Sequence, residues 1–389
     1  MTETPVQAPA EIAARRATAH VDVDAIERNC RMLAERLGDA ALCAVVKADG
    51  YGHGAAACAR AARDGGARWL AVATADEAAA LRAEDVEGPL LCMGALTADE
   101  LEVALQADAD LVVWTFPFLE LAAHRAAAMG ARARLHVKLD TGMGRLGTKD
   151  PAEARALVDA VARDEALSLG GFMTHFATAD EPQSAFFDEQ LERFTAVAHE
   201  VKSAHPDCIL HAANSAAVLR DARSHLDMAR CGIAVYGLDP FHEHPGSRRL
   251  SPALSLRSYV ADVKRFAPGE SAGYGRAWTA PRDTWVGVLP IGYGDGYRRG
   301  LSNVGEVLVR GRRYPVVGTV SMDNVTIELG ATTDVRRGDV ATLIGRDGGE
   351  QIVAEDVARK LDTINYEVTC GLSARVVRTH HRGGSTSGT

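Results

Sequence analysis

The chain has 389 residues, more than a single hydrophobic core usually spans, so two domains are expected, one of which can be a large barrel. Hydrophobic residues make up 47% of the sequence, which is ample for a core. The formal net charge of -9 argues against a nucleic-acid or anionic-membrane surface, because such partners need clustered positive charge, and it favours a small soluble substrate.

The N-terminal residues contain glutamates and prolines and lack the continuous apolar segment of a signal peptide or membrane anchor. We therefore expect a flexible segment over residues 1–18 and a cytoplasmic protein. Residues 19–24 alternate as a strand does, and this strand can pair with the C-terminal domain. Asp24 is expected to cap the helix that follows.

From Leu42 to about residue 240, apolar runs alternate with alanine-rich amphipathic stretches. This pattern predicts parallel strands joined by helices, and eight strands suit a closed (β/α)8 barrel of the TIM type over residues 19–248. A doubly wound open sheet is the alternative. The predicted strands begin at Leu42 and continue at Trp69–Ala73, Pro89–Met93, Asp110–Trp114, Ala133–Leu139, Leu169–Thr174, Cys208–His211 and Met228–Cys231.

The sequence pattern changes near residue 249, where short β-rich runs are separated by Gly, Pro and Asp. These runs predict a second, mainly antiparallel β domain over residues 249–380. The polar residues that follow, 381–389, are expected to be a disordered tail. The strands expected in this domain are Trp285–Leu289, Glu306–Arg310, Val316–Val320, Val325–Leu329 and Val340–Leu343.

Lys47 is the first candidate for chemistry, because the strand from Leu42 ends on it and breaks at once into the glycine-rich segment up to Gly54. A lysine desolvated by the sheet below it has a lowered pKa and becomes a nucleophile for a carbonyl carbon. A lysine at a strand end is more commonly a solvated charge, so Lys47 alone does not decide between the two interpretations.

Further polar residues follow the later strands, where barrel enzymes carry their reactive groups. Alternation places His136, Lys138 and Asp140 on one face of the fifth strand, and two cations and an acid in a barrel interior must compensate one another. Arg145 leaves a glycine-flanked loop and suits a bidentate grip on a carboxylate or phosphate, although a loop arginine is usually solvent-exposed. His175 follows the sixth strand, where a structural histidine is the ordinary interpretation.

Two segments after the last barrel strands favour an anion site. These are Asn214-Ser215 and Arg230-Cys231-Gly232-Ile233, and loops in these positions commonly bind phosphate through backbone N–H groups and a hydroxyl. No Walker phosphate loop occurs, and no G-x-G-x-x-G follows a strand. The seven scattered cysteines lack metal-ligand spacing, so we expect buried thiols and no metal.

Taken together, the motifs resemble those of the bacterial alanine racemases, which are barrel-type pyridoxal phosphate enzymes. The similarity runs from about His20 to Arg378, and the first of its motifs, with a lysine and a tyrosine four residues apart, is highly specific. The motifs are AVVKADGYGHG at 44–54, KLDTGMGRLG at 138–147, THFATAD at 174–180, NSAA at 214–217, RCGIAVYGL at 230–238, AGYGR at 272–276, SMDN at 321–324 and INYEVTCGLSARV at 364–376.

The resemblance implies a homodimer that interconverts L- and D-alanine with pyridoxal 5'-phosphate and supplies D-alanine for peptidoglycan. Lys47 would hold the cofactor as a Schiff base and act as the base on one face of the substrate, and Tyr274 of the partner subunit would be the base on the other face. His175 would support Tyr274, and Arg230 would face the pyridine nitrogen. The resemblance also implies phosphate contacts from Tyr51, Ser215, Gly232, Ile233 and Tyr366, and substrate-carboxylate contacts from Arg145 and the Met322 backbone. Family members often carbamylate the lysine that matches Lys138, which would turn an interior cation into an anion able to fix Arg145, and the sequence leaves open whether Lys138 is modified.

One departure concerns the channel to the site. Some relatives carry Arg-x-Cys before the Met-Asp pair, whereas this chain has Thr319-Val320-Ser321, so no arginine gate is assigned to this loop. Asp180 and Arg299 remain candidates for the channel lining. Three other functions stay open: a racemase of broad amino-acid specificity, a non-enzymatic pyridoxal phosphate carrier built from one barrel, and a barrel-type decarboxylase. The second domain with Tyr274 argues against the carrier.

Overall fold

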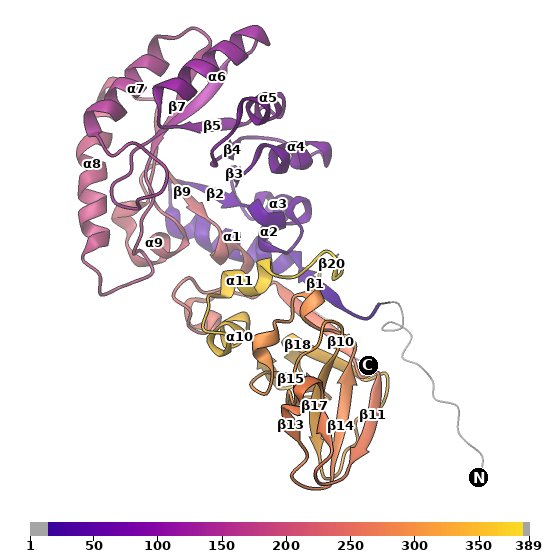
Figure 1. Cartoon of the computed structure of the whole chain (residues 1–389). Helices are drawn as coiled ribbons and strands as arrows, with labels where there is room; N and C mark the ends of the chain where they lie inside the picture. The colour runs from indigo at the N-terminus through magenta and orange to yellow at the C-terminus, as the bar shows by residue number, and fades with distance from the viewer. Residues whose placement is uncertain (1–14, 384–389) are drawn as a thin grey trace. The chain divides into compact units, whose positions relative to one another are not determined.

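The computed structural model describes residues 15–383 of the chain (Figure 1). These residues form two units. One holds Ala25–Phe241, and the other combines the chain up to Asp24 with the chain from His242 onward. The division therefore falls between residues 241 and 242 rather than after the expected residue 248.

The first unit is a barrel of parallel strands that follow one another in chain order. Its first strand pairs with its last, which is the order of a closed barrel and excludes a doubly wound sheet. The remaining gap is bridged by backbone hydrogen bonds from Asp227 N to Leu210 O (3.0 Å) and from Arg230 N to Ala213 O (2.9 Å). The strands are β2 (Ala41–Val45), β3 (Trp69–Val72), β4 (Leu90–Cys92), β5 (Asp110–Val113), β6 (Ala133–Lys138), β7 (Leu167–Met173), β8 (Ile209–His211) and β9 (Met228–Cys231).

The helices lie around the outside of these strands and bury their apolar faces against them (Figure 1). Two of them begin with a capping box, in which Thr74 pairs with Glu77 and Thr97 with Glu100. The helices are α1 (Val23–Leu37), α2 (Lys47–Tyr51), α3 (Ala55–Asp64), α4 (Ala75–Ala83), α5 (Ala98–Gln106), α6 (Phe116–Ala128), α7 (Pro151–Arg163), α8 (Phe186–Ala204) and α9 (Ser215–Arg220).

The second unit is built on strands that are mainly antiparallel. The N-terminal strand β1 (Thr18–Asp22) belongs to it and pairs antiparallel with β10 and parallel with β20. The other strands are β10 (Leu254–Tyr259), β11 (Asp262–Phe266), β12 (Ser271–Ala272), β13 (Trp278–Thr279), β14 (Thr284–Leu289), β15 (Glu306–Val309), β16 (Arg312–Pro315), β17 (Val325–Gly330), β18 (Val340–Asp347), β19 (Glu350–Ile352) and β20 (Val377–His381), with helices α10 (Ala354–Lys360) and α11 (Asn365–Cys370).

Two local predictions are wrong. The hydrogen bond at the start of α1 runs from Asp24 N to the Asp22 carboxylate (3.0 Å), so Asp22, not Asp24, occupies the capping position. The expected strand Val316–Val320 is a loop, because Gly318 adopts a left-handed conformation (φ 76°) that interrupts an extended run. The side chain of Asn303 holds this loop by accepting from Gly318 N.

The ends of the chain are ordered further than expected. Arg16 donates to the buried Asp295 carboxylate at 2.5 Å, so the flexible segment does not extend to residue 18. At the other end His381 lies in β20, so the predicted disorder does not begin at residue 381. The rest of both predictions, at residues 1–14 and 384–389, lies outside the described residues.

Six of the seven cysteines are buried as expected, but Cys370 at the end of α11 is exposed, which corrects the prediction for that residue. No group of three or more metal-binding side chains occurs within residues 15–383. In the same range, no helix combines the length and the apolar character that a membrane span requires.

Candidate active site

Lys47 follows β2 and opens a turn of unusual handedness. Ala48, Asp49, Gly50 and Tyr51 all have φ between 51° and 61°, so α2 is a left-handed turn. Residues other than glycine pay roughly 1–2 kcal/mol each in this conformation, so the surrounding structure must hold it in place. The turn closes on itself through Gly52 N, which donates to Ala48 O at 3.0 Å.

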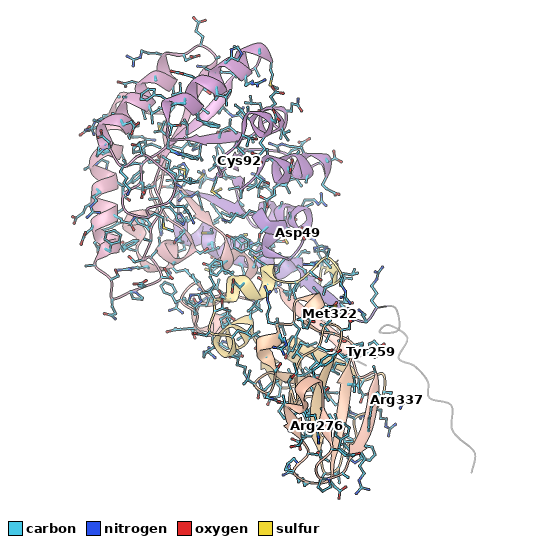
Figure 2. The ribbon with its side chains drawn as sticks, in the orientation of Figure 1. Asp49, Cys92, Tyr259, Arg276, Met322 and Arg337 are labelled. Carbon is cyan, nitrogen blue, oxygen red and sulfur yellow. The ribbon has the colours of Figure 1, made fainter. Side chains whose placement is uncertain are left out.

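Two side chains, one from α4 and one from the turn itself, stabilise this left-handed turn. Glu77, in the capping box of α4, accepts from Ala48 N at 2.6 Å with one carboxylate oxygen and from Ala73 N at 2.8 Å with the other. Asp49 (labelled in Figure 2) accepts from Ala55 N at 3.0 Å at the start of α3. The backbone beside Lys47 is therefore tied to the ends of two helices, which fixes where the lysine leaves the strand.

A second group of site residues gathers at the ends of β2, β8 and β9. The Tyr51 hydroxyl presses against Gly232, where a Cβ atom would lie 2.2 Å from that oxygen. The Ser215 hydroxyl accepts from Gly232 N at 3.0 Å and from Ala234 N at 3.3 Å. Ile233 begins the short 3-10 helix η2 (Ile233–Tyr236). Four of the five predicted phosphate residues thus lie together, and only glycine fits at position 232.

Arg230 is buried and is held by neutral acceptors. One terminal nitrogen donates to His211 Nδ1 (2.9 Å) and to the His211 carbonyl (3.1 Å). The other donates to the carbonyls of Thr174 (2.8 Å) and Ala212 (3.0 Å) and to His175 Nδ1 (3.2 Å). Burial lowers the pKa of Arg230 to about 10, which leaves it protonated at neutral pH.

The predicted cations of this unit influence one another electrostatically. Burial lowers the pKa of Lys138 to about 8, and the charges of Arg230, Arg145 and Lys47 act in the same direction, while Asp140 opposes them. Burial and the same positive neighbours keep the pKa of His175 well below its ordinary value. His175 is therefore neutral, and the Arg230 bond to its Nδ1 leaves the proton on Nε2.

Arg145 lies on an exposed loop whose backbone is held by hydrogen bonds to a side chain at the end of β6. Asp140 accepts from Gly142 N and from Gly144 N, at 3.0 and 2.9 Å. The buried Gln190 of α8 bridges the ends of β6 and β7, since its amide donates to the Thr141 hydroxyl and to the His175 carbonyl. The loop is thus positioned by polar contacts although its arginine reaches solvent.

The remaining predicted residues belong to the second unit or to exposed loops. Tyr274 is 75% exposed and lies in η4 (Tyr274–Arg276), and its carbonyl accepts from the Thr319 hydroxyl. Met322 (Figure 2) is 51% exposed, and its carbonyl accepts from Gly294 N at 2.9 Å. Tyr366 lies in α11 and is partly exposed. The channel candidates Asp180 and Arg299 are both exposed.

Sequence reasoning missed several residues that support this site. Glu77 carries a visible signal, because Thr74-x-x-Glu77 is a capping-box pattern, but that pattern does not show the bond to Ala48. Asp110 and His211 are polar residues at the ends of otherwise apolar strands, which marks them as candidates for an interior network. Gln190 has no such signal, because it lies in the middle of an amphipathic helix.

Comparison with known proteins covers nearly the whole chain. The family described as alanine racemase, N-terminal domain, matches residues 21–240, and alanine racemase, C-terminal domain, matches residues 253–380. An alanine racemase of Geobacillus stearothermophilus is 43% identical over 373 residues, with 94% of this chain and 93% of the relative covered. That of Symbiobacterium thermophilum is 41% identical over 370 residues, with 95% and 97% covered. The solved alanine racemase of Streptomyces coelicolor A3(2) has a TM-score of 0.90 and 38% identity, with 95% of this chain and 98% of that chain covered.

Proposed function

This chain belongs to the alanine racemase family, and we propose that it interconverts L- and D-alanine with pyridoxal 5'-phosphate. We further propose that it works in the cytoplasm as a homodimer and supplies D-alanine for peptidoglycan. The observation that carries the activity is the convergence of Lys47, Arg230 and the Tyr51–Ser215–Gly232 cluster at the carboxyl ends of β2, β8 and β9. Barrel enzymes place their reactive groups at these ends.

The residues present fit the phosphate of this cofactor. Two hydroxyl groups, of Tyr51 and Ser215, meet the backbone turn at Gly232 and Ile233, and the missing Cβ at Gly232 allows close approach. Such hydroxyl and N–H groups are the donors that a phosphate oxygen accepts from. Tyr366 of the second unit would add a third hydroxyl. Lys47 would hold the cofactor covalently through its amine.

Racemisation requires removing the α-proton from one face of alanine and returning one to the opposite face, so two acid/base groups must bracket the α-carbon. When bound, pyridoxal phosphate supplies a conjugated ring that stabilises negative charge at that carbon. The amine of Lys47 would exchange a proton with the α-carbon on one face. The hydroxyl of Tyr274, whose side chain is 75% exposed on its own unit, would do so on the other as part of a partner subunit's site.

Arg230 would face the pyridine nitrogen of the cofactor. Guanidinium groups donate hydrogen bonds and hold their protons firmly, so that nitrogen would stay unprotonated and less negative charge would spread into the ring. This arrangement would limit side reactions such as transamination. His175, neutral with its proton on Nε2, would donate to the Tyr274 oxygen and ease loss of the phenolic proton.

The substrate carboxylate would be held by Arg145 and by the N–H of Met322. Arginine offers parallel N–H groups that match two carboxylate oxygens, which fixes the orientation of the α-carbon. Since Lys138 lies among the charges of Arg230, Arg145 and Lys47, conversion of its amine to an anion would offset them and help to orient Arg145.

We predict that Lys138 reacts with carbon dioxide. With a pKa of about 8, roughly a tenth of its amine is neutral at pH 7, against well under ~0.1% for an ordinary lysine. The neutral nitrogen attacks the carbon of CO2 and releases a proton, so at constant CO2 pressure the carbamate increases as pH rises. Carbon-13 NMR of protein equilibrated with labelled CO2 measures the carbamate signal, and Lys138→Arg, which keeps the charge, should abolish it. A signal that is absent in the native protein contradicts the prediction.

One experiment tests the proposed function directly. Purified protein with added cofactor is incubated with L-alanine in deuterated water, and both optical rotation and α-deuteration are followed. We expect rotation to fall to zero while deuterium replaces the α-hydrogen. Unchanged rotation with the α-hydrogen retained refutes the racemase assignment, and the same assay with serine and basic amino acids defines the substrate range.

A further inference from the structure

A chain of buried hydrogen bonds runs through the barrel interior from Arg230 to a carboxylate. Arg230 Nη1 lies 2.9 Å from His211 Nδ1, His211 Nε2 lies 2.8 Å from His136 Nδ1, and His136 Nε2 lies 3.1 Å from Asp110 Oδ2. All four residues are at most 3% exposed. Asp110 opens β5 and His211 ends β8, so the chain connects the two ends of the barrel.

The carboxylate dictates where each proton in this chain lies. An ionised Asp110 only accepts, so His136 must carry its proton on Nε2 and present a bare Nδ1 to His211. His211 must then donate from Nε2, which leaves its own Nδ1 bare to accept from Arg230. Every bond therefore points toward Asp110, and bonds aligned in this way strengthen one another. Burial and the positive charge of Arg230 hold the pKa of His211 well below its ordinary value, consistent with a neutral ring.

The far end of the chain is anchored. Arg134 Nε donates to the other oxygen of Asp110 at 2.5 Å, and Arg134 Nη1 donates to the exposed Asp108 at 2.8 Å. This ion pair fixes which oxygen of Asp110 faces His136. Within residues 15–383 the hydrogen bond and ion pair of the Asp108 carboxylate are both with Arg134, so Asp108 provides a matched control.

Two glycines of β7 leave room for the His136 ring inside the barrel. Gly170 and Gly171 lie in the interior of β7, where glycine weakens a strand by about 0.5–1 kcal/mol relative to alanine. A Cβ at Gly171 would lie 2.3 Å from His136 Nδ1, and one at Gly170 would lie 2.8 Å from His136 Nε2 and 3.1 Å from Asp110 Oδ2. The two glycines thus accommodate His136 at the middle of the chain.

We propose that Asp110 and His136 are positioning residues for Arg230. By fixing the proton of each imidazole, they keep His211 Nδ1 as an acceptor that holds the guanidinium in one orientation. Because Asp110 is separated from Arg230 by two neutral rings, the arginine has an anionic anchor without a direct carboxylate partner that would neutralise its charge. The effect on racemisation rests on the proposed function, in which Arg230 faces the cofactor ring, whereas the proton positions do not.

The first test measures those proton positions in the native holoenzyme. Nitrogen-15 NMR of protein labelled at histidine distinguishes a protonated from a bare ring nitrogen, and we expect both His136 and His211 to carry the proton on Nε2. Assignment follows from the signals lost in His136→Gln and His211→Gln. A proton on Nδ1 of His211 in the native protein overturns the proposal, whether or not the protein is a racemase.

The second test is Asp110→Asn, with Asp108→Asn as its control. While the amide oxygen stays with Arg134, its NH2 group faces His136 and donates, so one bond in the chain becomes a clash of two donors. We expect a changed tautomer at His136 or His211 and a fall in kcat of at least about tenfold with little change in KM. Asp108→Asn should change neither. If Asp110→Asn leaves tautomers and kcat unchanged, the positioning role is wrong; if the tautomers change but kcat does not, Arg230 does not depend on this anchor.

Discussion

Lys47→Ala and Tyr274→Phe subunits, each nearly inactive alone, are expected to recover about a quarter of native activity when refolded together in equal amounts. If each site combines Lys47 of one subunit with Tyr274 of the other, a mixed dimer contains one site with both defects and one intact site. Half of the dimers are mixed under random pairing, which gives this fraction. The measurement is racemase activity of the refolded mixture relative to native protein treated in the same way.

The double variant Lys47→Ala/Tyr274→Phe provides a control of opposite sign. In a dimer with a native subunit, the double variant inactivates both sites. An excess of the double variant should therefore suppress native activity on refolding. Sites confined to one subunit predict the reverse on both counts, with no recovery in the first mixture and no suppression in the second. The exposed position of Tyr274 is what makes a shared site physically reasonable.

The Tyr274→Phe variant should separate hydrogen exchange from racemisation. We expect racemisation to fall by about 10²–10⁴-fold, because one acid/base group is lost. Lys47 can still remove a proton and return it to the same face, so one enantiomer of alanine should gain deuterium from deuterated water without changing configuration. The measurement compares α-deuteration with optical rotation for each enantiomer separately.

Tyr259→Phe is the matched control for this substitution. Tyr259 (Figure 2) lies in β10 of the same unit and outside the proposed site, so its variant should exchange and racemise like the native protein. If Tyr274→Phe loses exchange in both enantiomers to the same degree as racemisation, Tyr274 does not act as the second base.

Much of the barrel and of its site could be predicted from the sequence, because apolar runs end where polar residues begin. Parallel strands bring their carboxyl ends to one edge, so the strand boundaries place Lys47, Ser215 and Arg230 at that edge, whereas the roles proposed for them come from the resemblance. The same reasoning places His136 in the interior, where the structure shows it buried. Its hydrogen-bond partner Asp110 lies 26 residues away on another strand, and no sequence pattern predicts that the two side chains meet.

The features that sequence reasoning missed depend on contacts between distant segments. No local preference predicts that Ala48 and Asp49 adopt a left-handed conformation, since residues other than glycine disfavour it. Glu77 stabilises that turn from 29 residues away. In the second unit, β propensity predicted a strand at Val316–Val320, but a single left-handed glycine and a side-chain contact from Asn303 determined the loop instead.

Two residues of the proposed site also connect the strands β8 and β9. These neighbours share few backbone bonds, and side chains complete the connection: Ser215 accepts from Gly232 N, Asp227 accepts from Leu210 N, and Arg230 donates to the His211 carbonyl. The Ser215 and Arg230 atoms that are proposed to bind the cofactor therefore also help to close the barrel between its last two strands. A substitution at Ser215 or Arg230 would therefore remove a contact between β8 and β9 as well as a proposed cofactor contact.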